Sequence, residues 1–182
     1  MRVQQARFTS TDPAPTRALF GDLQPHLVTV FGAPVFFSDS RFVRELQNAY
    51  PDACLLGCST AGEISGEGVT ENDCILTGVQ FSHSRVVQAS ALLGSMDDSF
   101  DAGSRIGAQL ASSGLRAIIV FAPGVAINGS ALVDGIVRRL GKTVPITGGL
   151  AGDGGAFART WTLRSEGASS NEIVAIGLHG DS

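Results

Sequence analysis

Leu56-Gly57-Cys58-Ser59-Thr60-Ala61-Gly62-Glu63 and Ile146-Thr147-Gly148-Gly149-Leu150-Ala151-Gly152-Asp153 are two versions of one pattern. Each version begins with apolar, strand-like residues, continues into a turn of small residues, and ends in Ala-Gly and a carboxylate. The two are 90 residues apart, counted from Ala61 to Ala151, and the same shift aligns Val30-Phe31 with Val120-Phe121 without a gap. The sequence therefore predicts one supersecondary unit used twice, with a glycine loop at the same place in each.

The elements around the two loops have the same order in both halves. A β-branched strand at 26–31, a helix beginning near Ser40 and a short strand at 54–56 precede the first loop. A strand at 117–121, a helix at 128–140 and a short strand at 144–146 precede the second. Strand-helix-strand units favour parallel pairing with helices on the faces of the sheet. We therefore predict a mixed α/β fold with one largely parallel sheet, in a single domain of residues 1–182 whose degenerate repeats span about 26–93 and 115–181.

Further strands are predicted outside the two strand-helix-strand units. Residues 73–81 and 85–92 have strand patterns and are separated by Ser82-His83-Ser84, which predicts a hairpin. The patterns at 160–163 and 173–178 predict two closing strands that pair with each other. Antiparallel strands at both places would make the sheet mixed.

Composition excludes several classes of function. Of 182 residues, 43% are hydrophobic and 16% are charged, and the formal net charge is −4, so neither nucleic acid nor an anionic membrane surface is an expected partner. The sequence contains no apolar run of the length that spans a bilayer and no apolar N-terminal stretch of a secretory signal. Three cysteines, at 54, 58 and 74, lie in apolar contexts without a C-x-x-C spacing, which predicts buried free thiols. We expect a cytoplasmic protein.

The glycine loops are the main candidates for a binding site. A phosphate-binding loop opens a helix, whereas both of these loops lead towards strands, which disfavours nucleotide binding. One interpretation is that they are tight turns at strand ends. The other is that they face a shared cleft, because ligands of α/β sheets bind beyond the carboxyl ends of the strands. The candidate ligand-binding residues are Cys58, Ser59, Thr60, Gly62, Glu63, Gly149 and Asp153.

Catalysis receives less support from the same residues. Cys58 and Ser59 lie at a strand-to-loop turn, but the G-x-S-x-G pattern and the helix of a nucleophile elbow are missing. Glu63 and Asp153 could form a carboxylate pair for acid–base chemistry, although such residues more often hydrogen-bond to their own loop. We therefore expect no enzymatic activity and keep a hydrolase that uses Cys58 or Ser59 as an alternative.

The three histidines show no metal-binding spacing. His26, His83 and His179 are far apart in the sequence, and no Cys/His cluster accompanies them. A single histidine can still be the axial ligand of a haem, which needs no second ligand nearby in sequence. His179 and His83 are the candidates if haem is bound.

The loops also carry a resemblance to a known family. The segments 56–64, 148–153 and 176–181 resemble the N-terminal part of a FIST domain, a sensory module of signalling proteins. The resemblance covers nearly the whole chain, from about Val28 to Asp181, and the first loop is its most specific part. It implies a second, C-terminal FIST half, which this sequence lacks.

The resemblance implies a sensor that binds a small ligand, with amino acids as the proposed class. It implies that the domain regulates a partner histidine kinase, in two-component signalling, or an enzyme of cyclic-dinucleotide metabolism. One branch of the family resembles nitric oxide sensors that bind haem, which is the alternative within sensing. No set of catalytic residues is implied.

Overall fold

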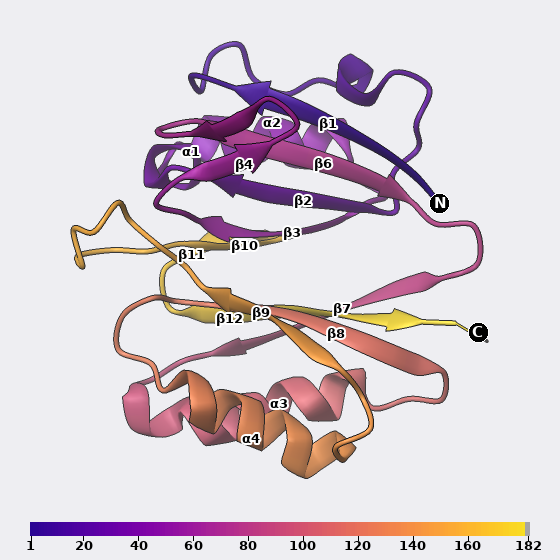
Figure 1. The fold of residues 1–182 in the computed structure, drawn as a ribbon, viewed down its shortest axis with the longest axis vertical. Helices are drawn as coiled ribbons and strands as arrows, with labels where there is room; N and C mark the ends of the chain where they lie inside the picture. Colours follow the sequence, from indigo (N-terminus) through magenta and orange to yellow (C-terminus); the bar gives the residue numbers. More distant parts are fainter. Residues whose placement is uncertain (181–182) are drawn as a thin grey trace.

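The computed structural model describes residues 1–180 as two β-sheets stacked between two layers of helices (Figure 1). The six-stranded sheet has the order β1-β6-β2-β3-β10-β11, and the four-stranded sheet has the order β7-β12-β8-β9. The strands are β1 (Arg2–Phe8), β2 (Leu27–Gly32), β3 (Cys54–Ser59), β4 (Glu63–Ser65), β5 (Gly68–Thr70), β6 (Cys74–Gln80), β7 (Arg85–Leu92), β8 (Leu115–Ala122), β9 (Ile146–Leu150), β10 (Thr162–Arg164), β11 (Gly167–Ser169) and β12 (Glu172–His179). Strands β4 and β5 form a separate two-stranded sheet.

The helices cover the outer faces of the sheets. The α-helices are α1 (Pro34–Ser38), α2 (Ser40–Ala49), α3 (Ser99–Leu110) and α4 (Gly129–Leu140), and two short 3-10 helices are η1 (Arg17–Phe20) and η2 (Met96–Asp98). Helices α2 and α4 begin behind Asp39 and Asn128, whose side chains accept hydrogen bonds from backbone N–H groups of the first turn. No helix among residues 1–180 is long and apolar enough to cross a membrane.

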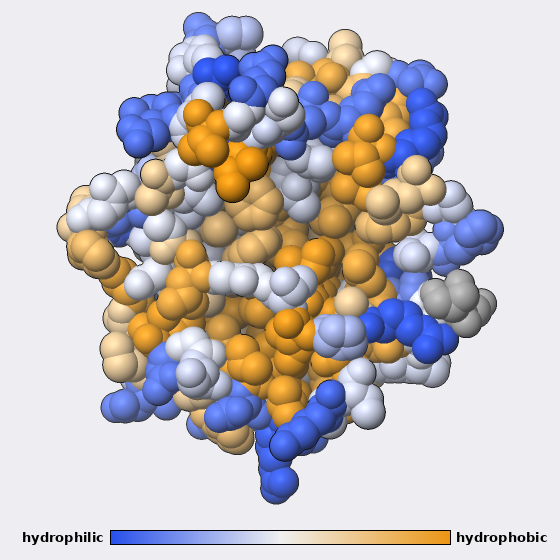
Figure 2. Space-filling model, in the orientation of Figure 1, coloured by the Kyte–Doolittle hydropathy of each residue, from blue (hydrophilic) through white to orange (hydrophobic). Residues whose placement is uncertain are grey.

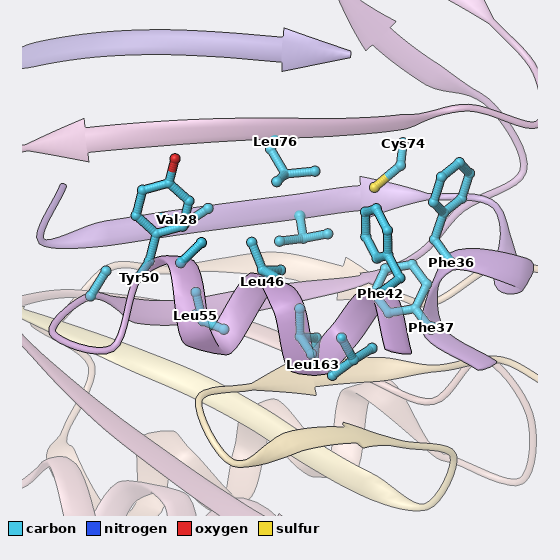
Figure 3. Close-up of a cluster of buried hydrophobic side chains, with 14 of the residues drawn as sticks. Val28, Phe36, Phe37, Phe42, Leu46, Tyr50, Leu55, Cys74, Leu76 and Leu163 are labelled. Carbon is cyan, nitrogen blue, oxygen red and sulfur yellow. The ribbon is translucent and has the colours of Figure 1, made fainter. Parts of the chain in front are cut away.

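Three hydrophobic clusters hold the layers together. In the first, Phe42 and Leu46 of α2 pack on Val28, Leu55 and Leu76 of the six-stranded sheet (Figure 3). A second cluster lies between the four-stranded sheet and helices α3 and α4. The third lies between the two sheets, because alternate residues of each strand point to opposite faces. The buried residues of this inter-sheet cluster are Leu27, Leu56, Cys58, Phe121, Ala151, Val174 and Ile176.

The predicted mixed α/β class is confirmed, but the chain forms two stacked sheets instead of one. Only β2 with β3 and β8 with β9 pair in parallel, and the other strand pairs are antiparallel. Each parallel pair is one of the two predicted strand-helix-strand units. The single-domain division and the repeat boundaries stay predictions, and residue 181, the end of the second repeat, lies outside the described residues.

Both predicted antiparallel pairs are wrong. Strand β6 lies between β1 and β2, so it has no free edge for β7, and the connection at 82–84 crosses to the other sheet. Strand β12 likewise lies between β7 and β8, while β10 pairs with β3 and β11 in the six-stranded sheet. Strand periodicity indicates that a segment is extended and buried, but it does not show which strand it pairs with.

Candidate functional site

The two glycine loops meet at the carboxyl ends of β3 and β9. The Gly152 N–H donates a hydrogen bond of 2.7 Å to the Ser59 carbonyl oxygen, which joins the loops directly. A Cβ atom at Gly152 would lie only 3.1 Å from the Ala61 nitrogen, so the close approach favours glycine. The loops follow strands of different sheets, and they therefore connect the two sheets at this end of the molecule.

A small pocket of about 220 Å³ opens between the two loops. Its volume is below the range of about 300–1,000 Å³ typical of drug-sized ligands, which suits a ligand of a few heavy atoms. The first loop, the second loop, the start of α1 and the turn before β6 all contribute to its wall. The lining residues are Ala33, Pro34, Thr60, Ala61, Glu63, Glu71, Asn72, Asp153 and Gly154.

The buried side chain of Glu63 holds the first loop in place through two hydrogen bonds. It is 1% exposed, its Oε1 accepts a hydrogen bond of 2.7 Å from the Thr60 hydroxyl, and its Oε2 accepts one of 3.1 Å from the Asp73 N–H. Both oxygens therefore have a protein donor, as a buried carboxyl group requires. These bonds connect the end of β3 to the start of β6 and hold the Thr60 side chain at the pocket wall.

Asp153 organises the second loop in a similar way. Its carboxylate accepts hydrogen bonds from the backbone N–H groups of Phe157, Ala158 and Arg159, at 3.0, 2.8 and 3.1 Å. Backbone donors stabilise the charged form, and the bond from Ala158 contributes most to holding the Asp153 pKa below its usual value. The side chain is thus an anion at neutral pH, and it closes the 153–159 loop, whose first two residues line the pocket.

The structure brings three of the seven predicted ligand-binding residues into this pocket and places the other four elsewhere. Thr60, Glu63 and Asp153 line the pocket. Gly62 lies in the same loop but faces the Thr70 carbonyl, and Gly149 borders a different hollow beside β9. The remaining two, Cys58 and Ser59, are buried and do not line the pocket.

Neither candidate nucleophile is available to a substrate in this conformation. Cys58 is 4% exposed within the inter-sheet cluster, and burial raises the pKa of its thiol to about 12, so it is protonated at neutral pH. Ser59 is fully buried, and its hydroxyl oxygen accepts a 2.9 Å hydrogen bond from the Trp161 N–H. Both side chains therefore belong to the packing below the pocket.

Sequence reasoning missed the far wall of the pocket. Glu71 and Asn72 belong to the turn that enters β6, and Asn72 has a left-handed backbone with φ of 63°. The Glu-Asn-Asp run at 71–73 was a detectable turn signal, since asparagine tolerates this conformation. Only the fold shows that this turn lines the same pocket as Asp153, which is 81 residues after Asn72 in the sequence.

The surroundings of His179 and His83, the two candidate haem ligands, do not fit a haem in this conformation. His179 lies at the opposite end of the sheets, where β12 ends beside Leu115. It is 4% exposed, its Nδ1 is 3.2 Å from the Ser112 hydroxyl, and its Nε2 is buried against Gly177 without a hydrogen-bond partner. His83 is exposed in the turn before β7, where it lines neither the loop pocket nor the hollow beside β9. No group of three or more His, Cys, Asp or Glu residues suited to a metal ion occurs within residues 1–180.

Comparison with known proteins places the chain in a family. The model of the FIST N domain matches residues 26–182, which contain all strands of both sheets except β1. No curated protein matches the sequence. Among solved structures, cyanuric acid hydrolase from A. caulinodans matches with 11% sequence identity, and the match covers 97% of this chain and 67% of the hydrolase chain. Its TM-score of 0.36 is too low to support an argument about fold or activity. The chain belongs to the FIST family, whose domains are sensory modules of signal transduction.

Proposed function

We propose that this FIST N domain is a non-catalytic sensor that binds a small, amino-bearing ligand of the amino acid class in the pocket between its two loops. One observation carries the proposal: the pocket wall is shared by loops that follow β3 and β9, from two different sheets. A ligand that contacts both loops can favour one arrangement of the layers over another. Such a difference in affinity between two conformations is what a sensor needs.

The charge of the pocket supports an ammonium group on the ligand. Three carboxylates, Glu63, Glu71 and Asp153, line it, and none of the nine lining residues is Lys or Arg. Asp153 and the exposed Glu71 offer acceptor oxygens to an ammonium donor. The Thr60 hydroxyl and the Asn72 amide could orient the rest of the ligand.

The signalling role of the family supports a protein partner downstream. We propose a histidine kinase or an enzyme of cyclic-dinucleotide metabolism, whose activity depends on the liganded state of this domain. The 153–159 loop is suited to transmit that state, because its carboxylate anchor lines the pocket while Phe157 is 83% exposed. Reconstitution with a candidate partner should show a ligand-dependent rate that Glu71→Gln abolishes, and a rate independent of ligand would contradict the coupling.

Thermal unfolding with defined probes tests the binding site. The probes are the twenty amino acids, with methylammonium and acetate as separate charge probes, and haem as the alternative ligand. At a ligand concentration 100 times Kd, binding adds about 2.7 kcal/mol of stability, which raises Tm by roughly 5–10 °C in a domain of this size. Because His179 is buried, we expect no Soret band that depends on it.

Two variants that each remove one exposed carboxylate test whether the ligand-induced rise in Tm depends on the pocket. Glu71→Gln removes an exposed lining carboxylate, while Glu45→Gln removes an exposed carboxylate from α2, away from the pocket. The ligand-induced rise in Tm should decrease in Glu71→Gln and stay at the wild-type value in Glu45→Gln. The proposal fails if no amino acid or amine raises Tm, or if both variants respond like the wild type.

A further inference from the structure

The two sheets share one four-strand arrangement. The order β1-β6-β2-β3 of one sheet corresponds to β7-β12-β8-β9 of the other, with the same parallel and antiparallel directions. Gly57 of β3 and Gly148 of β9 occupy equivalent positions, opposite Val30 and Val120. A Cβ atom at Gly57 would lie 2.1 Å from the Val30 carbonyl oxygen, and one at Gly148 would lie 1.8 Å from the Val120 carbonyl oxygen. The edges of β3 and β9 are therefore structural counterparts.

The edge of β3 is covered by a hairpin, whereas that of β9 is open. Strands β10 and β11 form the hairpin, and β10 pairs antiparallel with β3, so that Leu163 lies opposite Gly57 and is 1% exposed. Strand β9 pairs with β8 alone within residues 1–180. Its sequence, Ile-Thr-Gly-Gly-Leu, contains none of the charged or proline residues that protect exposed edges from pairing.

A second hairpin of the same form exists and covers no edge. Strands β4 and β5 match β10 and β11 in length and register, with Ile64 opposite Val69 as Leu163 is opposite Ala168. Both hairpins return through a glycine of positive φ, Gly68 or Gly167. Ile64 and Val69, however, are 76% and 75% exposed, and β4 and β5 pair only with each other in the described part of the chain.

The open edge also presents an apolar hollow. A cavity of about 340 Å³ lies between β9 and α4, bordered by Val133, Ile146 and Leu150 among others, and Val133 and Leu150 are 38% and 49% exposed. Figure 2 shows hydrophobic surface along β9 and also at the β4–β5 hairpin, both on the face towards the viewer. Exposed apolar surface of this kind marks an interaction site.

We propose that a second copy of this chain covers the β9 edge with its β4–β5 hairpin. The partner's β4 would pair antiparallel with β9, with its Ile64 opposite Gly148 as Leu163 is opposite Gly57. Its Ser65 would then lie opposite Thr147, and its exposed Ile64 and Val69 would fill apolar surface beside β9. Each copy offers both the β4–β5 hairpin and the open edge of β9, so a twofold pair satisfies both reciprocally.

Sedimentation of the purified chain over a range of concentrations tests the proposal. The wild type should form dimers, and Ile64→Lys should weaken the dimer at least ~10-fold, because it places a charge in the buried centre of the interface. Met96→Lys, at a 52% exposed residue before α3, is the matched control and should leave the dimer unchanged. Because Ile64 is exposed in the single chain, the variant should keep the wild-type Tm when dilute.

Disulfide trapping tests the proposed register. Mixing Ser65→Cys with Thr147→Cys should give a covalent heterodimer under mild oxidation, and mixing Met96→Cys with Thr147→Cys should not. A chain that stays monomeric at every concentration, or a dimer that Ile64→Lys does not weaken, would overturn the proposal. Failure of this test would leave the ligand site between the loops untouched, since its assay depends on Glu71.

Discussion

Truncating Leu163 should destabilise the single chain strongly, whereas truncating Ile64, the equivalent residue of the other hairpin, should leave its stability nearly unchanged. Leu163 is 1% exposed and packs into the cluster beneath α2, whereas Ile64 is 76% exposed. Leu163→Ala removes buried methyl groups and leaves a cavity, which should cost about 3 kcal/mol. Ile64→Ala should change the free energy of unfolding by no more than about 0.5 kcal/mol.

Trp161 provides the assay. It is the only tryptophan, it directly precedes β10, and the Arg159 guanidinium lies 4.4 Å from the centroid of its ring. Urea unfolding followed by its fluorescence, on dilute protein, should show a clearly lower midpoint for Leu163→Ala. A loss of about 3 kcal/mol corresponds to a Tm lower by roughly 6–12 °C. Equal midpoints for the two variants would refute the assignment of a buried and a free hairpin.

Three further predictions concern buried polar groups. Cys58 should react with a thiol reagent only after unfolding in urea, because it is buried with a pKa raised to about 12; rapid labelling of the native chain would contradict this. Burial and nearby Arg85 lower the pKa of His179 in the folded chain, so the unfolded chain takes up the proton at a higher pH than the folded chain does. The free energy of unfolding should therefore fall as pH drops below about 6.5, the usual histidine pKa. His179→Gln should reduce that pH dependence in urea titrations. Glu63→Ala should lower stability by about 1–3 kcal/mol, because it leaves the Asp73 N–H and the Thr60 hydroxyl without their buried acceptor, and an unchanged Tm would argue against that role.

The strand-helix-strand units were predictable because their signals are local. The β-branched run at 26–31, the capping residue Asp39 and the apolar spacing of Phe42 and Leu46 are all patterns of residues close together in the sequence. The free thiols of Cys58 and Cys74 are buried, as their apolar contexts predicted, whereas Cys54 is only half-buried.

Strand neighbours were not predictable, because pairing partners are set by the whole sheet. Strand β6 is extended in either arrangement, and only its position between β1 and β2 prevents a hairpin with β7. The three-residue strand β11 is too short to give a periodic signal.

The candidate site was predictable where it depends on the repeated pattern. The Ala-Gly-carboxylate segments placed Thr60, Glu63 and Asp153 at strand ends, and the structure brings these residues to one pocket. Their orientation was not predictable: Glu63 and Asp153 accept hydrogen bonds from Asp73 and Ala158, which lie outside the two repeated segments. Glu71 also enters the pocket from a turn outside the pattern.

Backbone amide NMR during titration with the amino acid that raises Tm most tests directly whether the two loops form one ligand site. Chemical-shift changes should concentrate in both loops and in the turn before β6, at Thr60, Glu71 and Gly154 above all. Changes confined to one loop, or centred on His179 at the other end of the sheets, would contradict a shared site.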